Sequence, residues 1–224
     1  MMKKSVSNYI ALATLLLSAV AGACSKDKVP DTITMTTEMN GVIDIFMAGS
    51  GSVSIDWGNG SEPYKYSLKN YNDLGDGRDD RFWFSHACTP GTSIRISGSR
   101  ITHLICGNNQ LSAIDVKGNP SLKELACYGN PIRDLDVSHN TALEFLNCKN
   151  TLLTSLDLSC NTALYALYCQ ENNFSAEALQ AMFATLHNRT LRGVQKTVLI
   201  RDNPGANSFA LGTVINGWII DTML

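Results

Sequence analysis

Three successive stretches of 21 residues are variations on one pattern: residues 101–121 read ITHLICGNNQLSAIDVKGNPS, residues 122–142 read LKELACYGNPIRDLDVSHNTA, and residues 143–163 read LEFLNCKNTLLTSLDLSCNTA. Residues 164–174 (LYALYCQENNF) begin a fourth copy. A fixed period of this length is the signature of an architecture whose units stack on one another. The columns that recur at this period are Leu104, Leu125, Leu146 and Leu167; Cys106, Cys127, Cys148 and Cys169; Asp115, Asp136 and Asp157; and Asn119, Asn140 and Asn161.

Each half of the unit alternates apolar and polar residues, as at Leu104 and Cys106 and again at Ile114 and Val116. This alternation predicts a strand in both halves of every unit. A single unit cannot bury its apolar face, so neighbouring units must stack and place equivalent residues in ladders. The asparagine columns are expected at turns, where side-chain amides bond backbone groups of their own and the adjacent turn. For the aspartate column, a structural hydrogen-bonding role is expected before a cation site.

The unit L-x-x-L-x-C-x-x-N-x-L-x-x-L-D-V-x-x-N-x-x resembles the 21-residue bacterial leucine-rich repeat that has cysteine in its first strand. The match covers residues 101–174, and it departs from the family at Thr151, where asparagine is usual, and at Glu177-Ala178, where Leu-Asp is usual. The resemblance implies a short solenoid of about three and a half repeats over residues 100–174.

The four repeat cysteines, Cys106, Cys127, Cys148 and Cys169, raise the question of disulfides or a metal site. No C-x-x-C spacing is present, and each cysteine occupies an inward column where related repeats carry leucine. Neighbouring strands would place these residues within disulfide range, but parallel side-chain directions disfavour a bond. Cysteine packs well as a small apolar residue, so buried free thiols are expected.

The region before the repeats predicts β structure. Its expected strands are Thr32–Thr36, Val42–Met47, Ser52–Trp57, Phe82–Phe84 and Ser93–Ile96, with a turn at Gly49-Ser50-Gly51 and a hairpin turn at Asn59-Gly60. The segment Asp56-Trp57-Gly58-Asn59-Gly60, with His86 and Thr89-Pro90-Gly91 after it, resembles a PKD-type β-sandwich. A sandwich over residues 31–99 would cover the open edge of the repeats, because no linker separates the two.

The region after the repeats predicts a cap over residues 175–224. Ser175 suits a helix N-cap, and Leu179, Met182, Phe183 and Leu186 follow at helical spacing on a face expected to pack on the core. Strands are expected at Thr197–Ile200 and Gly217–Ile220, with a turn at Asn203-Pro204-Gly205. The fold class is therefore mainly β: a small β-sandwich followed by a short leucine-rich-repeat solenoid with a C-terminal α/β cap.

The first residues predict export. A basic start at Lys3-Lys4 and an apolar run over residues 9–20 indicate a signal peptide over residues 1–23, too short for a stable membrane span. Ala21-Gly22-Ala23-Cys24 resembles a lipobox, which implies lipid on Cys24 and a polar tether over residues 24–30. We therefore expect an outer-membrane lipoprotein, held by its lipid alone and displayed on the cell surface.

Composition excludes several function classes. Lys plus Arg number 18 against 20 for Asp plus Glu, the net charge is −2, and the basic residues are scattered, so no nucleic-acid partner is expected. Neither H-E-x-x-H nor G-x-S-x-G occurs, and no nucleophile–base pair follows from spacing, so we expect no enzyme, no cofactor and no metal. The acidic residues Asp73, Asp76, Asp79 and Asp80 offer oxygen ligands for calcium, but a solvated loop is favoured because the EF-hand pattern is missing.

The candidate binding surface is the outward side of the first strand of each unit. Its aromatics, Tyr128, Phe145 and Tyr168, with Tyr165 at the margin, are expected to anchor a ligand, and Glu124 and Lys149 to orient it. The alternative is that the rings merely cover the sheet. The leading function is a monomeric surface protein that binds host protein or glycan, and the alternative is a structural or accessory lipoprotein, or spacer, in an outer-membrane complex.

Overall fold

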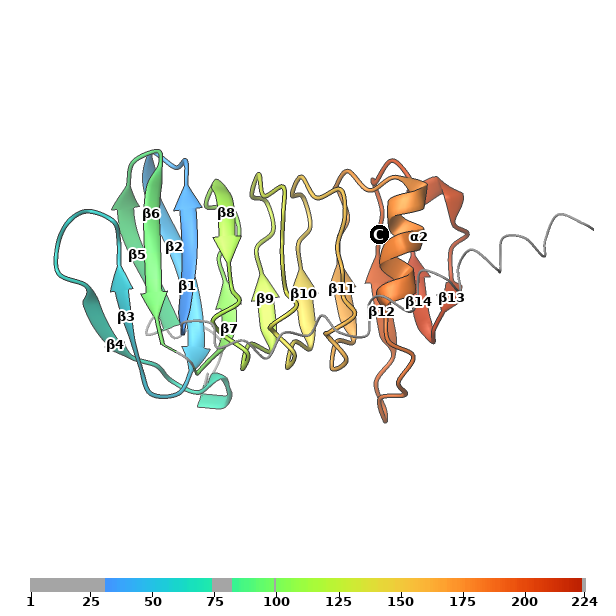
Figure 1. Ribbon diagram of the computed structural model, residues 1–224, viewed down its shortest axis with the longest axis horizontal. Helices are drawn as coiled ribbons and strands as arrows, with labels where there is room; N and C mark the ends of the chain where they lie inside the picture. Colours follow the sequence, from blue (N-terminus) through green and yellow to red (C-terminus); the bar gives the residue numbers. More distant parts are fainter. Residues whose placement is uncertain (1–30, 74–81, 99, 223–224) are drawn as a thin grey trace, which may run out of the picture.

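A computed structural model describes residues 31–73, 82–98 and 100–222 of the chain. It is mainly β, with a five-stranded sheet in the order β4-β3-β6-β1-β8 and a nine-stranded sheet in the order β13-β14-β12-β11-β10-β9-β7-β2-β5 (Figure 1). The strands are β1 Thr32–Thr37, β2 Gly41–Gly49, β3 Ser52–Asp56, β4 Tyr64–Ser67, β5 Trp83–Cys88, β6 Thr92–Ser97, β7 Ile101–Ile105, β8 Leu111–Asp115, β9 Glu124–Ala126, β10 Phe145–Asn147, β11 Ala166–Tyr168, β12 Lys196–Leu199, β13 Thr213–Ile215 and β14 Trp218–Asp221; the helices are η1 Tyr71–Asp73, α2 Ala176–Thr185 and η3 Ala206–Ser208.

The N-terminal strands form where alternation predicted them. In β3 and just after it, Val53, Ile55 and Trp57 are buried, because period-2 alternation puts all three on one face. β3 pairs antiparallel with β4, which confirms the hairpin. Asn59 and Gly60 lie within a connection that runs from residue 57 to residue 63, longer than the tight turn that the dipeptide favours.

The first halves of the units form a parallel ladder. β7, β9, β10 and β11 pair in parallel with each leucine opposite the next, so the four leucines of the column stand side by side. All four leucines are fully buried. β12 and β14 continue the ladder in the C-terminal region with Val198 and Ile220 in the same column. The predicted strand in the first half of each unit is confirmed.

The second halves behave differently, and here the strand prediction is wrong for all but the first unit. β8 is a strand because it pairs antiparallel with β1. Residues 132–137 and 153–158 form no strand. The alternating pattern still buries Val137 and Leu158 there. A strand, however, also needs a neighbouring segment within backbone hydrogen-bond distance, and alternation in the sequence does not provide one.

The N-terminal strands and the repeats share both sheets. β2 pairs with β7 in one sheet and β1 pairs with β8 in the other, so the expectation that the N-terminal region covers the edge of the repeats is confirmed. One hydrophobic core runs without interruption from Ile33 to Ile220. Asn109 reinforces the junction, since its side chain exchanges two hydrogen bonds with the backbone of Asp44 at 3.0 and 2.8 Å.

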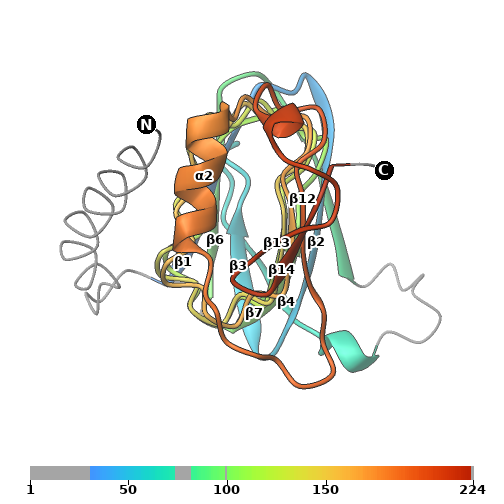
Figure 2. The same cartoon turned by 90° about the vertical axis from the view of Figure 1, so that its right-hand side faces the viewer.

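The C-terminal region closes the far end of this core. Ser175 caps α2 by accepting a hydrogen bond from the backbone N–H of Ala178, as predicted. Leu179, Met182 and Phe183 are buried. Viewed along the molecule, α2 lies on the side of β1 and β6, opposite the wall that contains β2 and β12 (Figure 2). The helix thus lies at the position that a second half of the fourth unit would occupy.

A first asparagine column lies just after the parallel strands: Asn109, Asn130, Asn172 and Asn203, with Thr151 in the third place. The side-chain oxygen of Asn130 accepts the backbone N–H groups of Asn109 and Leu111 at 2.9 and 3.0 Å. Its amide donates to the carbonyls of Cys106 and Cys127 at 3.0 and 2.9 Å. Asn130 therefore joins two adjacent units through both ends of its amide.

A second asparagine column, Asn119, Asn140 and Asn161, lies at the turns on the other side. Asn140 donates to the carbonyls of Val116 and Asn119 at 2.9 and 2.8 Å, and Asn161 repeats this one unit later. The side-chain oxygens of Asn140 and Asn161 are buried and have no partner among the described residues. Neither amide atom of Asn119 has one either, because Asn119 begins the column and no preceding unit offers it carbonyls.

Candidate functional site

The outer face of the parallel ladder consists of the side chains that alternate with the buried leucine column. The pairing fixes two rows across the strands. One row runs through His103, Glu124, Phe145 and Ala166, and the next through Ile105, Ala126, Asn147 and Tyr168. Residues of adjacent strands in one row stand about 4.8 Å apart.

The structure brings two of the three predicted aromatics together. Phe145 and Tyr168 lie on adjacent strands with ring centroids 5.0 Å apart and planes at 83°, an edge-to-face contact. Tyr128 lies apart from this pair, because its ring packs directly on Gly107 and a Cβ there would come within 2.5 Å of it. All three rings are half-buried.

The predicted polar residues lie around this pair, and each charged one has a partner. Glu124 lies 4.0 Å from the imidazole of His103, and burial raises the pKa of its carboxyl. Burial, and then the nearby Lys123, lower the pKa of His103, so both groups are shifted towards neutrality. Lys149 forms an ion pair of 3.0 Å with Glu171.

Tyr165 lies one residue before β11. Its backbone N–H donates to the carbonyl of Glu144, and its side chain is half-buried. This places it at the margin of the outer face, as the sequence predicted.

Sequence reasoning missed an aromatic group next to the repeats. Phe46 of β2 contacts Phe82 and Trp83 with ring centroids at 5.6 and 5.5 Å, and Tyr71 of η1 stacks on His103 at 4.0 Å and 10°. Phe46 and Phe82 form, with Ala48, a small hydrophobic cluster separate from the main core. Only the pairing of β2 with β7 places them beside the repeats, and no local pattern reveals that pairing.

The loop that follows β3 begins with an aromatic residue, Trp57. Trp57 is buried and stacks on His86 at 4.9 Å, and Asn59 lies 3.1 Å from the Nε2 atom of His86. The indole of Trp57 therefore packs in the core and is not accessible to a ligand.

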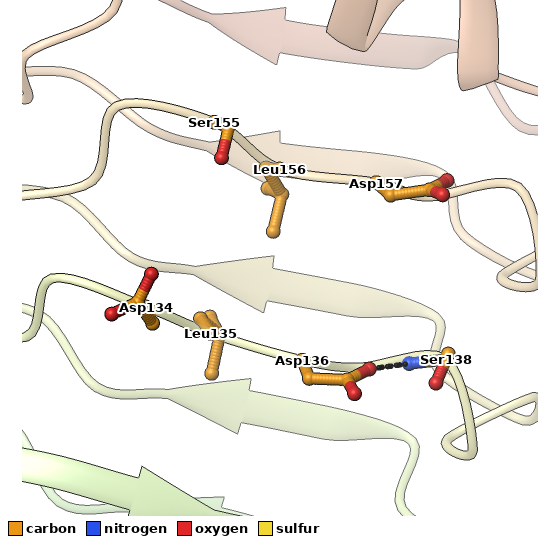
Figure 3. Close-up of a pocket in the computed structure, with 7 residues that line it drawn as sticks. All are labelled: Asp134, Leu135, Asp136, Ser138, Ser155, Leu156 and Asp157. Atoms are coloured by element: carbon orange, nitrogen blue, oxygen red, sulfur yellow. Dashed lines mark hydrogen bonds between the residues drawn. The ribbon is translucent and has the colours of Figure 1, made fainter.

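On the opposite side, a hollow of about 430 Å³ lies between the second halves of two units (Figure 3). Asp136 accepts the backbone N–H of Ser138 at 2.9 Å and pairs with Lys117 at 3.0 Å. Burial would raise the pKa of Asp136, but the bonds from Ser138 and Lys117 prevail and lower it to about 2. Asp115 and Asp157 make the same backbone bond to the residue two positions on, so the structural role predicted for this column is confirmed.

The repeat cysteines are free and fully buried, as predicted. Burial raises the pKa of Cys127 and Cys169 to about 12, and that of Cys106 and Cys148 well above the ordinary value. A protonated, inaccessible thiol is neither a nucleophile nor a ready metal ligand.

Within the described part of the chain, no three His, Cys, Asp or Glu side chains cluster as metal ligands would, and no helix is long and apolar enough to cross a bilayer. Asp76, Asp79 and Asp80 of the predicted acidic loop, and Cys24 of the predicted lipid site, lie outside the described residues.

No protein-family model and no curated protein matches the chain. Among solved structures, it is similar to the functional domain of InlJ from Listeria monocytogenes, which includes a cysteine ladder, at 23% sequence identity and a TM-score of 0.39. The alignment covers 54% of this chain and 25% of that one, so the chain spans about a quarter of its length. A similarity this low decides neither fold family nor function.

Proposed function

We propose that this chain is a surface-exposed, lipid-anchored leucine-rich-repeat protein of an outer membrane, and that it binds an extracellular protein or glycan through its outer face. The solenoid assignment is supported by the 21-residue period, by the parallel pairing of β7, β9, β10 and β11, and by the first asparagine column. Binding is supported chiefly by the Phe145–Tyr168 pair, two half-buried rings in edge-to-face contact on the outer face.

The ladder beneath suits this role because it holds the rings in place. Leu146 and Leu167 lie directly inward of them and are fully buried. A preorganised surface loses little side-chain freedom when it binds, which leaves more of the contact energy for affinity.

The test of binding uses the chain on cells and as purified protein. Probes are immobilised fibronectin, fibrinogen and type IV collagen, together with neutral and acidic polysaccharides. We expect at least one probe to be bound, and the double variant Phe145→Ala/Tyr168→Ala to bind it about tenfold or more weakly with an unchanged melting curve. Tyr64→Ala is the matched control, since Tyr64 is an exposed aromatic on the other sheet.

If no probe is bound, or if the double variant binds as the parent does, the outer face is not the binding surface. The role of spacer or accessory lipoprotein then becomes the better account.

The anchor has its own test. Cys24→Ala should abolish labelling by radioactive palmitate and release the protein from membranes washed with high salt, because the thiol is the acceptor of the lipid. Digestion of intact cells by added protease should remove the parent protein if it faces outward. Retention of the variant in washed membranes would rule out the lipoprotein assignment.

A further inference from the structure

The aromatic group beside the repeats consists of Phe46, Tyr71, Phe82 and Trp83, and two of these side chains are exposed on the outer side of the nine-stranded sheet. Trp83 is 47% exposed and Tyr71 is 41% exposed, while Phe46 and Phe82 beneath them are 6% and 1% exposed. Rings that rest on a buried aromatic base are held in place, although their outer surfaces face solvent.

This group lies in line with the repeat aromatics. Trp83 is paired in register with Phe46, Phe46 with Ile105, and Ile105 with Ala126. The same row continues through Asn147 to Tyr168. Five strand spacings therefore separate Trp83 from Tyr168, a distance of about 24 Å.

Between the two aromatic ends the row consists of three uncharged side chains, those of Ile105, Ala126 and Asn147. Ala126 has the smallest side chain of the row. The side-chain oxygen of Asn147 already accepts the backbone N–H of Lys149 at 3.1 Å, which leaves its NH₂ group to donate outward. A ligand crossing this stretch meets the apolar side chain of Ile105, a methyl group and an amide donor.

Most of the charges that border the row are compensated within the protein. The exception is Glu124, which lies 4.0 Å from His103 and whose carboxyl pKa is raised by burial. Lys123 pairs with Glu144 at 2.9 Å, and Lys149 and Arg201 lie 3.0 and 3.8 Å from Glu171. A charged partner would have to compete with these pairs, whereas a neutral one leaves them intact. The electrostatics of this surface therefore favour an uncharged ligand.

We infer that the outer face binds a neutral polysaccharide laid across the strands, with sugar rings stacked on Trp83 and Tyr71 at one end and on Phe145 and Tyr168 at the other. The C–H face of a sugar ring is apolar and its edge carries hydroxyl groups, which matches aromatic rings at both ends of the row and an amide donor between them. The inference rests on the proposed function and specifies its ligand class.

The experiment is affinity electrophoresis of the full chain in gels containing dextran, mannan, laminarin or xylan, with polygalacturonate as the acidic comparison. We expect retardation by at least one neutral polymer, little change in it between low and moderate salt, and a fivefold or greater loss of affinity in Trp83→Ala and in Tyr168→Ala. Tyr64→Ala, with a residue of 48% exposure on the other sheet, should be retarded like the parent.

Chain length supplies a second readout that folding defects do not imitate. For the retained polymer, affinity should rise with oligosaccharide length until the ligand spans about 24 Å and then level off. In Trp83→Ala/Tyr71→Ala the rise should stop at a shorter length, because only the end formed by Phe145 and Tyr168 remains.

Absence of retardation by all four neutral polymers, or equal retardation of Trp83→Ala and the parent, overturns the inference. If a protein probe is still bound and still lost in Phe145→Ala/Tyr168→Ala, the proposed function stands and only the ligand class is wrong. If the protein binds neither the polymers nor the protein probes, both proposals fail.

Discussion

The two asparagine columns occupy equivalent places on opposite sides of the same repeat, yet they are bonded very differently. In the first column, Asn130 uses its oxygen and its amide, and joins two units. In the second, Asn140 uses only its amide, and its oxygen is buried without a partner among the described residues. The column beside the hydrogen-bonded strands is saturated, while the column beside the unpaired second halves is not.

The difference teaches where this fold is rigid. A buried polar group that keeps all its bonds specifies one arrangement, whereas a half-satisfied one stabilises less, because its unpaired atom has lost its contact with water. The outer face rests on the saturated side, and the hollow of Figure 3 lies on the other. Rigid support is what a set of aligned binding rings requires.

The largest effect is expected for Asn130→Ala. The substitution leaves two buried N–H groups and two buried carbonyls without their partner, and should lower the free energy of unfolding by about 4 kcal/mol. Urea unfolding followed by circular dichroism measures it. A loss below about 1 kcal/mol would mean that the first column does not hold the units together.

The thiols on the strand side should make stability depend on pH. Burial raises the pKa of Cys127 and Cys169 from 9.0 to about 12, so between these pH values the folded chain keeps protons that the unfolded chain releases. Stability is therefore fully present below pH 9 and falls as pH rises towards 12, by at most about 1.4 kcal/mol per pH unit for each thiol.

Urea titrations under reductant from pH 8 upward test this dependence. The control is Cys127→Ala/Cys169→Ala, which should be less stable at pH 8 but lose stability less steeply above pH 9. Identical slopes for parent and control would show that other groups cause the alkaline loss.

Within the second column, Asn140→Ala and Asn119→Ala form a matched pair. Asn140→Ala removes two bonds to carbonyls and should cost about 1–2 kcal/mol. Asn119→Ala removes an amide that has no partner among the described residues and should change stability by less than about 0.5 kcal/mol. A large loss from Asn119→Ala would indicate an ordered partner, such as a buried water molecule.

One substitution in the first column is expected to stabilise the protein by a small amount. Thr151 takes the third place of the first column, and its hydroxyl is within hydrogen-bond distance of the carbonyl of Cys148 and of the side-chain oxygen of Asn172 in the next unit. Asparagine at this place would also reach the preceding unit, as Asn130 does. Thr151→Asn should raise the free energy of unfolding by about 1 kcal/mol if the side chain adopts the geometry of Asn130. Thr151→Val, which keeps the shape without a hydroxyl, is the control and should be destabilising.

Much of the repeat region could be predicted from the sequence, because a fixed period fixes register as well as strand positions. Leu104, Cys106 and their counterparts are buried where alternation put them, and Ser175 caps the helix expected after the last unit. The second halves were mispredicted, since alternation reports burial and says nothing about whether a neighbouring segment lies within bonding distance.

The candidate site was less accessible to sequence reasoning. Phe145 and Tyr168 are neighbours because one period separates strands and the outward parity of both can be counted. Phe46 and Trp83 join the same row only through antiparallel pairings between residues far apart in the chain, at Phe46–Trp83 and Phe46–Ile105. Such pairings depend on tertiary packing, and no spacing in the sequence encodes them.

The shared core has a consequence for how such a protein can change length. Because each unit docks on the last with the same register, duplicating residues 122–142 would add one rung without disturbing either end of the molecule. The insertion would move Phe145 and Tyr168 about 4.8 Å farther from Trp83, since the N-terminal strands and the added rung belong to one sheet. The number of repeats thus sets the distance between the two aromatic ends. Adding or removing a repeat changes this distance in fixed steps, while the aromatic side chains at the two ends stay the same.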